Sequence, residues 1–276
     1  MYYTGKMIDL FEMAMIQLLE SAGYPVIKHI DCISRRCFGY EVGGVVKNWF
    51  SPTVKMSKAI MYIAEETGVK INCTKAETAE DIAKMCDEYR TVLIGPVKGG
   101  VAAPLMKDYY YNGASRYLII SGMESGGYSV SDPQGIPELY IAESDIENFI
   151  EDTYTVFING KGEVRQPDAR YILRQGLEYH EKIQDRERSE LIRAAGMYCG
   201  GRGQQISLAY AVMNLALQLD KVFWLTDDAG ILNKTMIQEY IMLKQQLYQS
   251  GQQEEPERIS EIVENVWRLL KNAGEI

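Results

Sequence analysis

The hydrophobic pattern of this 276-residue chain changes its period once, near residue 160. Before that point, helical stretches alternate with short runs of β-branched and aromatic residues. After it, almost every apolar stretch repeats at helical spacing. We therefore predict an α+β core domain over residues 1–160, followed by an all-helical C-terminal region over residues 161–276.

The first predicted helix begins at Asp9, a residue type that caps helices, and ends at Gly23 and Pro25. Five residues at helical spacing form its apolar face: Phe11, Ala14, Met15, Leu18 and Leu19. Similar patterns predict helices over residues 54–66, 79–89, 169–195, 206–219, 234–250 and 257–271. The helix over residues 206–219 is apolar on several sides, which favours a buried or subunit-facing position.

Short runs rich in β-branched and aliphatic residues predict strands over residues 91–94, 116–120, 128–131 and 154–158. The first of these is expected to end at Gly95-Pro96. Gly126-Gly127 separates the second run from the third, and this dipeptide is typical of a hairpin turn.

The net charge of −9 argues against a nucleic-acid or anionic-membrane partner. No run of about 18 apolar residues is present, so no membrane-spanning helix is expected. Asp9, Glu12 and Gln17 interrupt the apolar stretch that a signal peptide would need near the N-terminus. The five cysteines have no disulfide-like spacing. We expect a cytoplasmic protein with free thiols and no cofactor.

Two segments carry a resemblance to a known family. They are Arg116–Gly122 and Tyr128–Pro133, which follow the N-terminal helix in that order. This order resembles the papain-like cysteine peptidase superfamily, in particular its bacteriocin-leader-processing peptidases. The Gly23-Tyr24-Pro25 turn and the Cys37–Tyr40 segment are similar to a biosynthetic branch of that class. This branch includes the N-terminal domain of the butirosin-biosynthesis H protein and the amide-forming enzyme of closthioamide biosynthesis.

The resemblance covers about residues 7–150 and implies a papain-like core, with an N-terminal helix packed on an antiparallel sheet. Such enzymes use a cysteine at the start of the first helix, a histidine that takes its proton and a carboxylate that orients the histidine. The matching positions here are Asp9 or Leu10 for the cysteine, Arg116 for the histidine and Asp132 for the carboxylate. Two of the three positions are therefore substituted, and the thiol mechanism is not expected.

Three functional hypotheses follow. The first is a degenerate homologue of the amide-forming acyltransferases, which binds an acyl or peptidyl carrier or a peptide, or partners an active paralogue. In this hypothesis Asp9, Arg116 and Asp132 would form a structural ion-pair clamp. The second is an active acyltransferase or peptidase that uses Asp9 as a base on an activated thioester. The third is a structural or regulatory interaction protein that forms homo- or hetero-oligomers through its helical region.

Other residues suggest weaker alternatives. His29, Cys32 and Cys37 would supply three metal ligands, but their spacing matches no zinc pattern and an ordinary loop is expected. Arginines at 35 and 36 would lower the pKa of either thiol and make it reactive, although buried cysteines that serve as small apolar residues are the simpler interpretation. The Gly200–Gly203 segment would hold a phosphate, although a break between helices is the simpler interpretation. His180 is expected on the surface of a charged helix.

Overall fold

The computed structural model describes most of the chain. The described residues are 10–37, 41–42, 50–51, 56–97, 116–124, 126–133, 136–150, 153–159, 162–182, 216–217, 219–253 and 256–272. Contacts divide the chain into two compact units. Unit 1 contains residues 1–30 and 63–166, and unit 2 contains residues 31–62 and 167–276.

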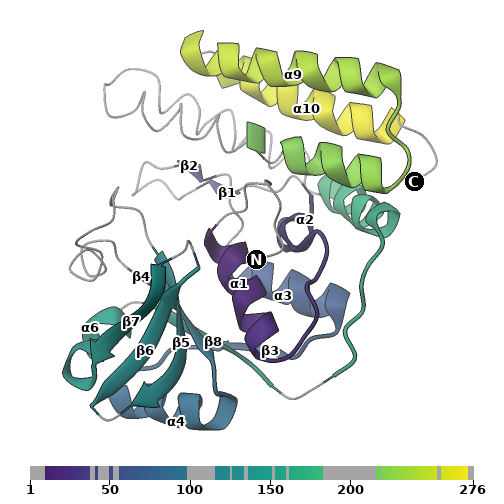
Figure 1. Ribbon diagram of the computed structural model, residues 1–276. Coiled ribbons are helices and arrows are strands. Elements are labelled where there is room, and N and C mark those ends of the chain that lie inside the picture. The colour runs from purple at the N-terminus through teal and green to yellow at the C-terminus, as the bar shows by residue number, and fades with distance from the viewer. Residues whose placement is uncertain are drawn as a thin grey trace. The chain divides into compact units, whose positions relative to one another are not determined.

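Unit 1 is built on a six-stranded sheet with the order β3-β8-β4-β5-β6-β7 (Figure 1). The strands are β3 (Ile71–Thr74), β4 (Val92–Val97), β5 (Arg116–Glu124), β6 (Gly127–Asp132), β7 (Ile136–Ala142) and β8 (Tyr154–Ile158). All neighbouring strands run antiparallel. The fold class is therefore α+β, as the sequence predicts.

Three helices pack on the sheet: α1 (Leu10–Ser21), α4 (Ala79–Tyr89) and α6 (Ile146–Ile150), with a 3-10 turn η2 (Glu143–Asp145) before the last. Helix α3 (Met56–Thr67) is shared between the two units. Apolar residues of α4 and α6 pack on one face of the sheet and form a continuous core with alternate residues of β4, β5 and β6. The Tyr128 hydroxyl fixes this layer, because it donates a hydrogen bond to the carbonyl oxygen of Ala79 at 3.0 Å.

The start of α4 shows why its boundary could be read from the sequence. The Thr78 hydroxyl accepts a hydrogen bond from the Asp81 N–H at 3.2 Å, and the Asp81 carboxylate accepts one from the Thr78 N–H at 3.1 Å. These two bonds form a capping box and satisfy backbone groups that the first turn would otherwise leave unpaired.

The four predicted strands are confirmed as β4, β5, β6 and β8, but one predicted end is wrong. β4 continues through the cis Gly95-Pro96 bond to Val97 rather than stopping at it. The β4–β5 register shifts between Ile94 and Val97, and a proline without an N–H is tolerated at such an irregularity. β3 and β7 were not predicted, the latter because Pro137 interrupts its pattern.

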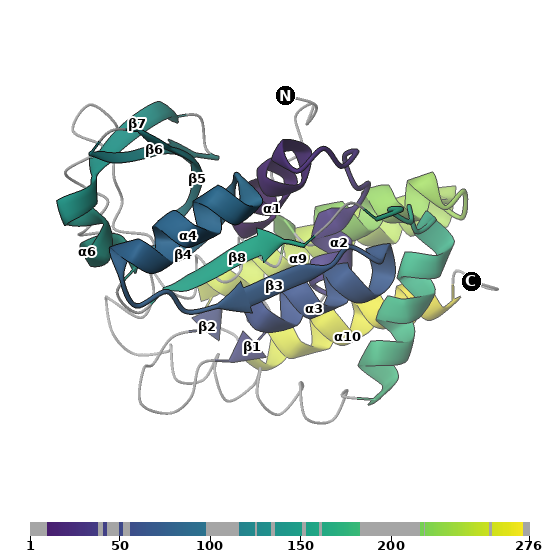
Figure 2. The same cartoon turned by 90° about the horizontal axis from the view of Figure 1, so that it is seen from below.

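Unit 2 contains α2 (Ile30–Ser34), a two-stranded ladder of β1 (Glu41–Val42) and β2 (Phe50–Ser51), and the long helices α9 (Lys234–Gln253) and α10 (Pro256–Asn272). Residues 169–182 and 219–228 are also helical. Helices α9 and α10 run side by side in both views (Figures 1 and 2). Residues 206–215, part of the predicted apolar helix, and the Gly200–Gly203 segment lie outside the described residues.

The two units do not follow a single cut in the sequence. The last of the three boundaries between the units, between residues 166 and 167, is close to the predicted change of pattern at residue 160. However, residues 31–62 group with the helical unit, and the division passes through α3 between Tyr62 and Ile63. Hydrophobic periodicity does not reveal this grouping, because it reports local structure and not long-range contacts.

Candidate functional site

Helix α1 is held on the sheet by both apolar and polar contacts. The apolar residues predicted for its buried face are all buried: Phe11, Ala14, Met15, Leu18 and Leu19. The Phe11 ring meets the edge of the Tyr117 ring, at the start of β5, with 5.5 Å between centroids. Farther along the helix, Gln17 Nε2 donates a hydrogen bond to Ser131 Oγ at 2.7 Å. These contacts fix α1 over the start of β5 and the end of β6.

Arg116 and Asp132 form a buried ion pair at this end of the sheet. Arg116 is the first residue of β5 and Asp132 the last residue of β6, and antiparallel pairing brings these two ends together. Arg116 Nη1 lies 3.8 Å from Asp132 Oδ2, and only 7% and 1% of the two side chains are exposed. The separation is that of an ion pair and is longer than a hydrogen bond. Breaking such a pair on one side leaves a buried charge uncompensated.

Strand alternation separates the residues around this ion pair. Tyr117 and Ser131 contact α1, whereas Leu118 and Val130 belong to the core under α4. Arg116 shares the parity of Leu118 along β5, so its Cβ projects toward the α4 side. Tyr117 is therefore the residue at the start of β5 that meets α1. The sequence analysis did not single it out, although period-two alternation from Leu118 would have assigned it to that face.

The structure brings together two of the three residues that match the family triad. Arg116 and Asp132 are paired and buried. Asp9 lies outside the described residues, and of Leu10 only the backbone, as the first residue of α1, is described. The segments α1, β5 and β6 contain no cysteine and no histidine, so this junction has neither a thiol nor an imidazole of its own.

Unit 2 contains a second group of buried polar residues, around α2. Lys221 Nζ lies 3.7 Å from Asp31 Oδ2, and the Cys32 N–H donates to Asp31 Oδ1 at 3.0 Å. Arg36 lies over the Tyr62 ring, with its guanidinium carbon 4.4 Å from the ring centroid. This group fixes α2 within unit 2.

The prediction that His180 is a surface residue is wrong. Its side chain is only 5% exposed, and its ring packs edge-on against Tyr179, which meets Tyr62 in the same way. The charged residues that follow His180 in the sequence suggested exposure, but the aromatic packing of unit 2 covers this position. A long-range contact of this kind leaves no local signal in the sequence.

The thiols near α2 do not have the environment of a reactive cysteine. Cys32 and Cys37 are both buried. Burial raises the pKa of Cys37 to about 12, and the nearby Arg36 lowers it by less than burial raises it. The Cys37 thiol donates a hydrogen bond to the Ile172 carbonyl at 3.3 Å. Among the described residues, no group of three or more histidine, cysteine or acidic side chains is placed to hold a metal ion.

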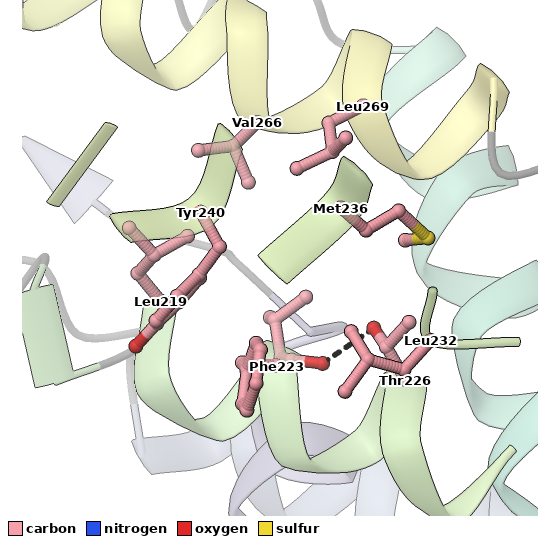
Figure 3. A pocket seen from close by; sticks show the side chains of 9 residues that line it. Leu219, Phe223, Thr226, Leu232, Met236, Tyr240, Val266 and Leu269 are labelled. Carbon is pink, nitrogen blue, oxygen red and sulfur yellow. Dashed lines mark hydrogen bonds between the residues drawn. The ribbon is translucent and has the colours of Figure 1, made fainter. Parts of the chain in front are cut away.

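An apolar pocket opens between helices of unit 2 (Figure 3). Residues of the 219–228 helix, of the loop before α9, of α9 and of α10 line it: Leu219, Val222, Phe223, Thr226, Leu232, Met236, Tyr240, Val266 and Leu269. The Thr226 hydroxyl is engaged with the Val222 carbonyl at 2.7 Å. Tyr240 Oη donates to Asp220, so neither hydroxyl is directed at a ligand. The pocket offers apolar contact only.

The comparisons with known proteins add no family to this description. Neither a scan against models of protein families nor a search of curated proteins finds a match. None of the helices in the described ranges combines the length and the apolar character that crossing a membrane requires.

Proposed function

We propose that this protein is a non-catalytic relative of the papain-like amide-forming acyltransferases. It would bind an acyl or peptidyl carrier, or a peptide, without transferring the acyl group. An active paralogue would supply the chemistry. The observation that carries the proposal is the buried Arg116–Asp132 ion pair at the two positions that match the histidine and carboxylate of the family.

Arginine at this position is incompatible with the thiol mechanism. The guanidinium group of an arginine is always protonated in proteins, so it does not take a proton from a nucleophile. The histidine of an active triad must change its protonation state in each cycle, whereas this pair has the properties of a permanent structural contact.

The loss of catalytic groups does not remove the surface around them. Helix α1 is packed over β5 and β6 by Phe11, Tyr117, Gln17 and Ser131, and these contacts involve none of the lost groups. Binding and chemistry are separable on one fold. Retention of this packing supports a role in which the ends of β5 and β6 hold the ligand and leave it unchanged.

The test is a carrier protein loaded with an acyl thioester on its phosphopantetheine arm, incubated with the full chain and a primary amine. Intact mass spectrometry of the carrier reports transfer, and a fluorescence titration of the labelled carrier reports binding. We expect saturable binding. We also expect the carrier to lose its acyl group no faster than it does in a sample without the protein. The unloaded carrier serves as the control for recognition of the acyl group.

Two results would contradict the proposal. The first is an amide product that disappears in Asp9→Asn while the circular dichroism spectrum is unchanged, which would support an active enzyme with a carboxylate base. The second is the absence of binding to loaded carriers and to peptides of the leader type. In that case the resemblance would not extend to ligand choice.

A further inference from the structure

Strand β3 has one side of its backbone available for pairing with another strand. It is the last strand at one edge of the six-stranded sheet, where it pairs with β8 (Figure 2). The Asn159 N–H donates a hydrogen bond to the Lys70 carbonyl at 2.9 Å, which sets the phase of the antiparallel ladder between the two strands. Because hydrogen-bonded and non-hydrogen-bonded pairs alternate along such a ladder, the backbone groups of Ile71 and Cys73 point away from β8.

These outward groups are open within the described part of the chain. No hydrogen bond to the N–H or C=O of Ile71 or Cys73 is found among the described residues. The opposite edge of the sheet is less suited to strand addition, because β7 contains Pro137, which has no N–H to donate. A row of backbone donors and acceptors at strand spacing is complementary to an extended polypeptide.

An exposed lysine flanks β3 on each side. Lys70 directly precedes the strand and Lys75 directly follows it, and both side chains are exposed. The Lys75 ammonium lies over the Tyr154 ring, 5.7 Å from its centroid, and this ring is itself partly exposed. We call the outward backbone of Ile71 and Cys73, together with these two lysines, the β3 edge. A cation at each end of the strand favours a peptide with acidic side chains near both of its ends.

We propose that the β3 edge binds an extended peptide segment of a partner protein, which adds a strand to the sheet and carries an acidic residue near each end. The same lysines argue against a second copy of this chain as the occupant. When two β3 edges pair antiparallel with Ile71 opposite Cys73, Lys70 of each copy comes close to Lys75 of the other, and like charges so placed are destabilising.

The β3 edge belongs to a different strand from Arg116 and from Asp132. The inference therefore goes beyond the proposed function and does not depend on it.

The first experiment titrates a labelled peptide into the full chain and follows its fluorescence anisotropy. The probe is a heptapeptide with alternating valine and threonine in its centre and aspartate at each end. We expect saturable binding. A peptide with lysine at each end should bind at least about tenfold more weakly, because it places like charges together. The double variant Lys70→Glu with Lys75→Glu should reverse this preference. It should keep the wild-type fold, since both side chains are exposed.

A second experiment tests the backbone pairing. Ile71→Pro removes one outward N–H and no hydrogen bond of the β3–β8 ladder, so the sheet should persist. Its affinity for the aspartate-ended peptide should fall at least about tenfold. In the wild type, saturating peptide should slow the alkylation of Cys73 by iodoacetamide, and the buried Cys86 serves as the control for general protection. Circular dichroism reports whether each variant is folded, and the charge reversal decides the proposal if Ile71→Pro is not.

Three results would overturn the proposal. The first is the absence of saturable binding of the aspartate-ended peptide, and the second is equal binding of the two peptides. The third is a wild-type dimer in light scattering that Ile71→Pro dissociates, because the β3 edge would then be a contact between two copies of this chain.

Discussion

Lys221 and Asp31 lie 190 residues apart in the sequence, and their side chains meet in the interior of unit 2. Lys221 Nζ is 3.7 Å from Asp31 Oδ2, with 4% and 10% of the two side chains exposed. Asp31 also accepts a hydrogen bond from the Cys32 backbone, so its carboxylate is engaged on both oxygens. This pair ties the first segment of unit 2 to the second.

Removal of one partner should be strongly destabilising. Lys221→Met leaves the Asp31 carboxylate buried without its cation and should lower the free energy of unfolding by about 3–5 kcal/mol. Asp31→Asn combined with Lys221→Met should recover part of this loss, because no charge then remains. Urea denaturation measures the free energy of unfolding of the single and the double variant. Lys84→Met, which breaks an exposed pair with Glu80, should have little effect and serves as the control.

Gly176 should not tolerate a side chain. A Cβ there would lie 2.6 Å from Cys37 Sγ and 2.9 Å from Cys37 Cβ. Gly176→Ala should therefore reduce stability by about 1–3 kcal/mol, measured by thermal or urea unfolding. Cys37→Gly, combined with Gly176→Ala, should restore part of the lost stability because it removes the Cβ and Sγ atoms of Cys37. Cys37 also has a positive φ of 68°, which glycine adopts readily.

The control for this substitution is Gly162→Ala, where no heavy atom lies within 4 Å of the added carbon. An equal loss of stability in both variants would show that the contact with Cys37 is not the cause.

The capping box of α4 should make stability depend on pH in the acid range. Hydrogen bonds from the Glu77 and Thr78 backbone lower the pKa of Asp81 below its usual value of 3.8. The stabilisation is present above that value and is lost as the pH falls through the lower pKa of the folded state. Urea titrations between pH 5 and pH 2 should show this loss of stability. Asp81→Asn should remove the part of the pH dependence of the free energy of unfolding that comes from Asp81.

The cap itself can be tested separately with Thr78→Ala. Loss of the hydroxyl that accepts from the Asp81 N–H should reduce stability by about 1 kcal/mol. Thr78→Ser keeps an acceptor at the same position and should stay close to the wild type. If both variants lose the same stability, the methyl group of Thr78 and not the cap would be responsible.

The thiols should differ in their rates of alkylation. Cys37 is buried with a pKa of about 12, whereas Cys73 is only partly buried, although burial raises its pKa too. Because the thiolate is the reactive form, iodoacetamide at pH 8 should modify Cys73 well before Cys37. Mass spectrometry of peptides follows both sites in one sample. Faster labelling of Cys37 would show that unit 2 opens around α2 on the time scale of the reaction.

The sequence predicts the elements whose pattern is local. Helix α1 shows the expected apolar face, and α4 begins at a recognisable capping box. The sequence does not predict β7, because Pro137 interrupts its pattern. The strand is defined by its pairing with β6, which local pattern does not reveal. The register between β4 and β5 shifts at Pro96, which no local rule locates.

The sequence draws attention to Arg116 and Asp132 only through a resemblance in the order of motifs. The structure shows that these two residues form an ion pair, and their assignment to a functional site stays a prediction. The Gln17–Ser131 hydrogen bond joins residues 114 positions apart, and its partners depend on how α1 lies across the sheet. The burial of His180 likewise results from tertiary packing that overrides the polar character of its own helix.

The interleaving of the two units has a consequence for the order in which the chain is synthesised. Residues 31–62 leave the ribosome early, but the segment they group with begins only at residue 167. Asp31 therefore has no access to Lys221 until most of the protein has been made. Unit 1 can fold once residue 166 has emerged from the ribosome, although residues 31–62, which interrupt it in the sequence, still lack the rest of unit 2. A messenger that ends near codon 170 would encode all of unit 1 but only the early segment of unit 2.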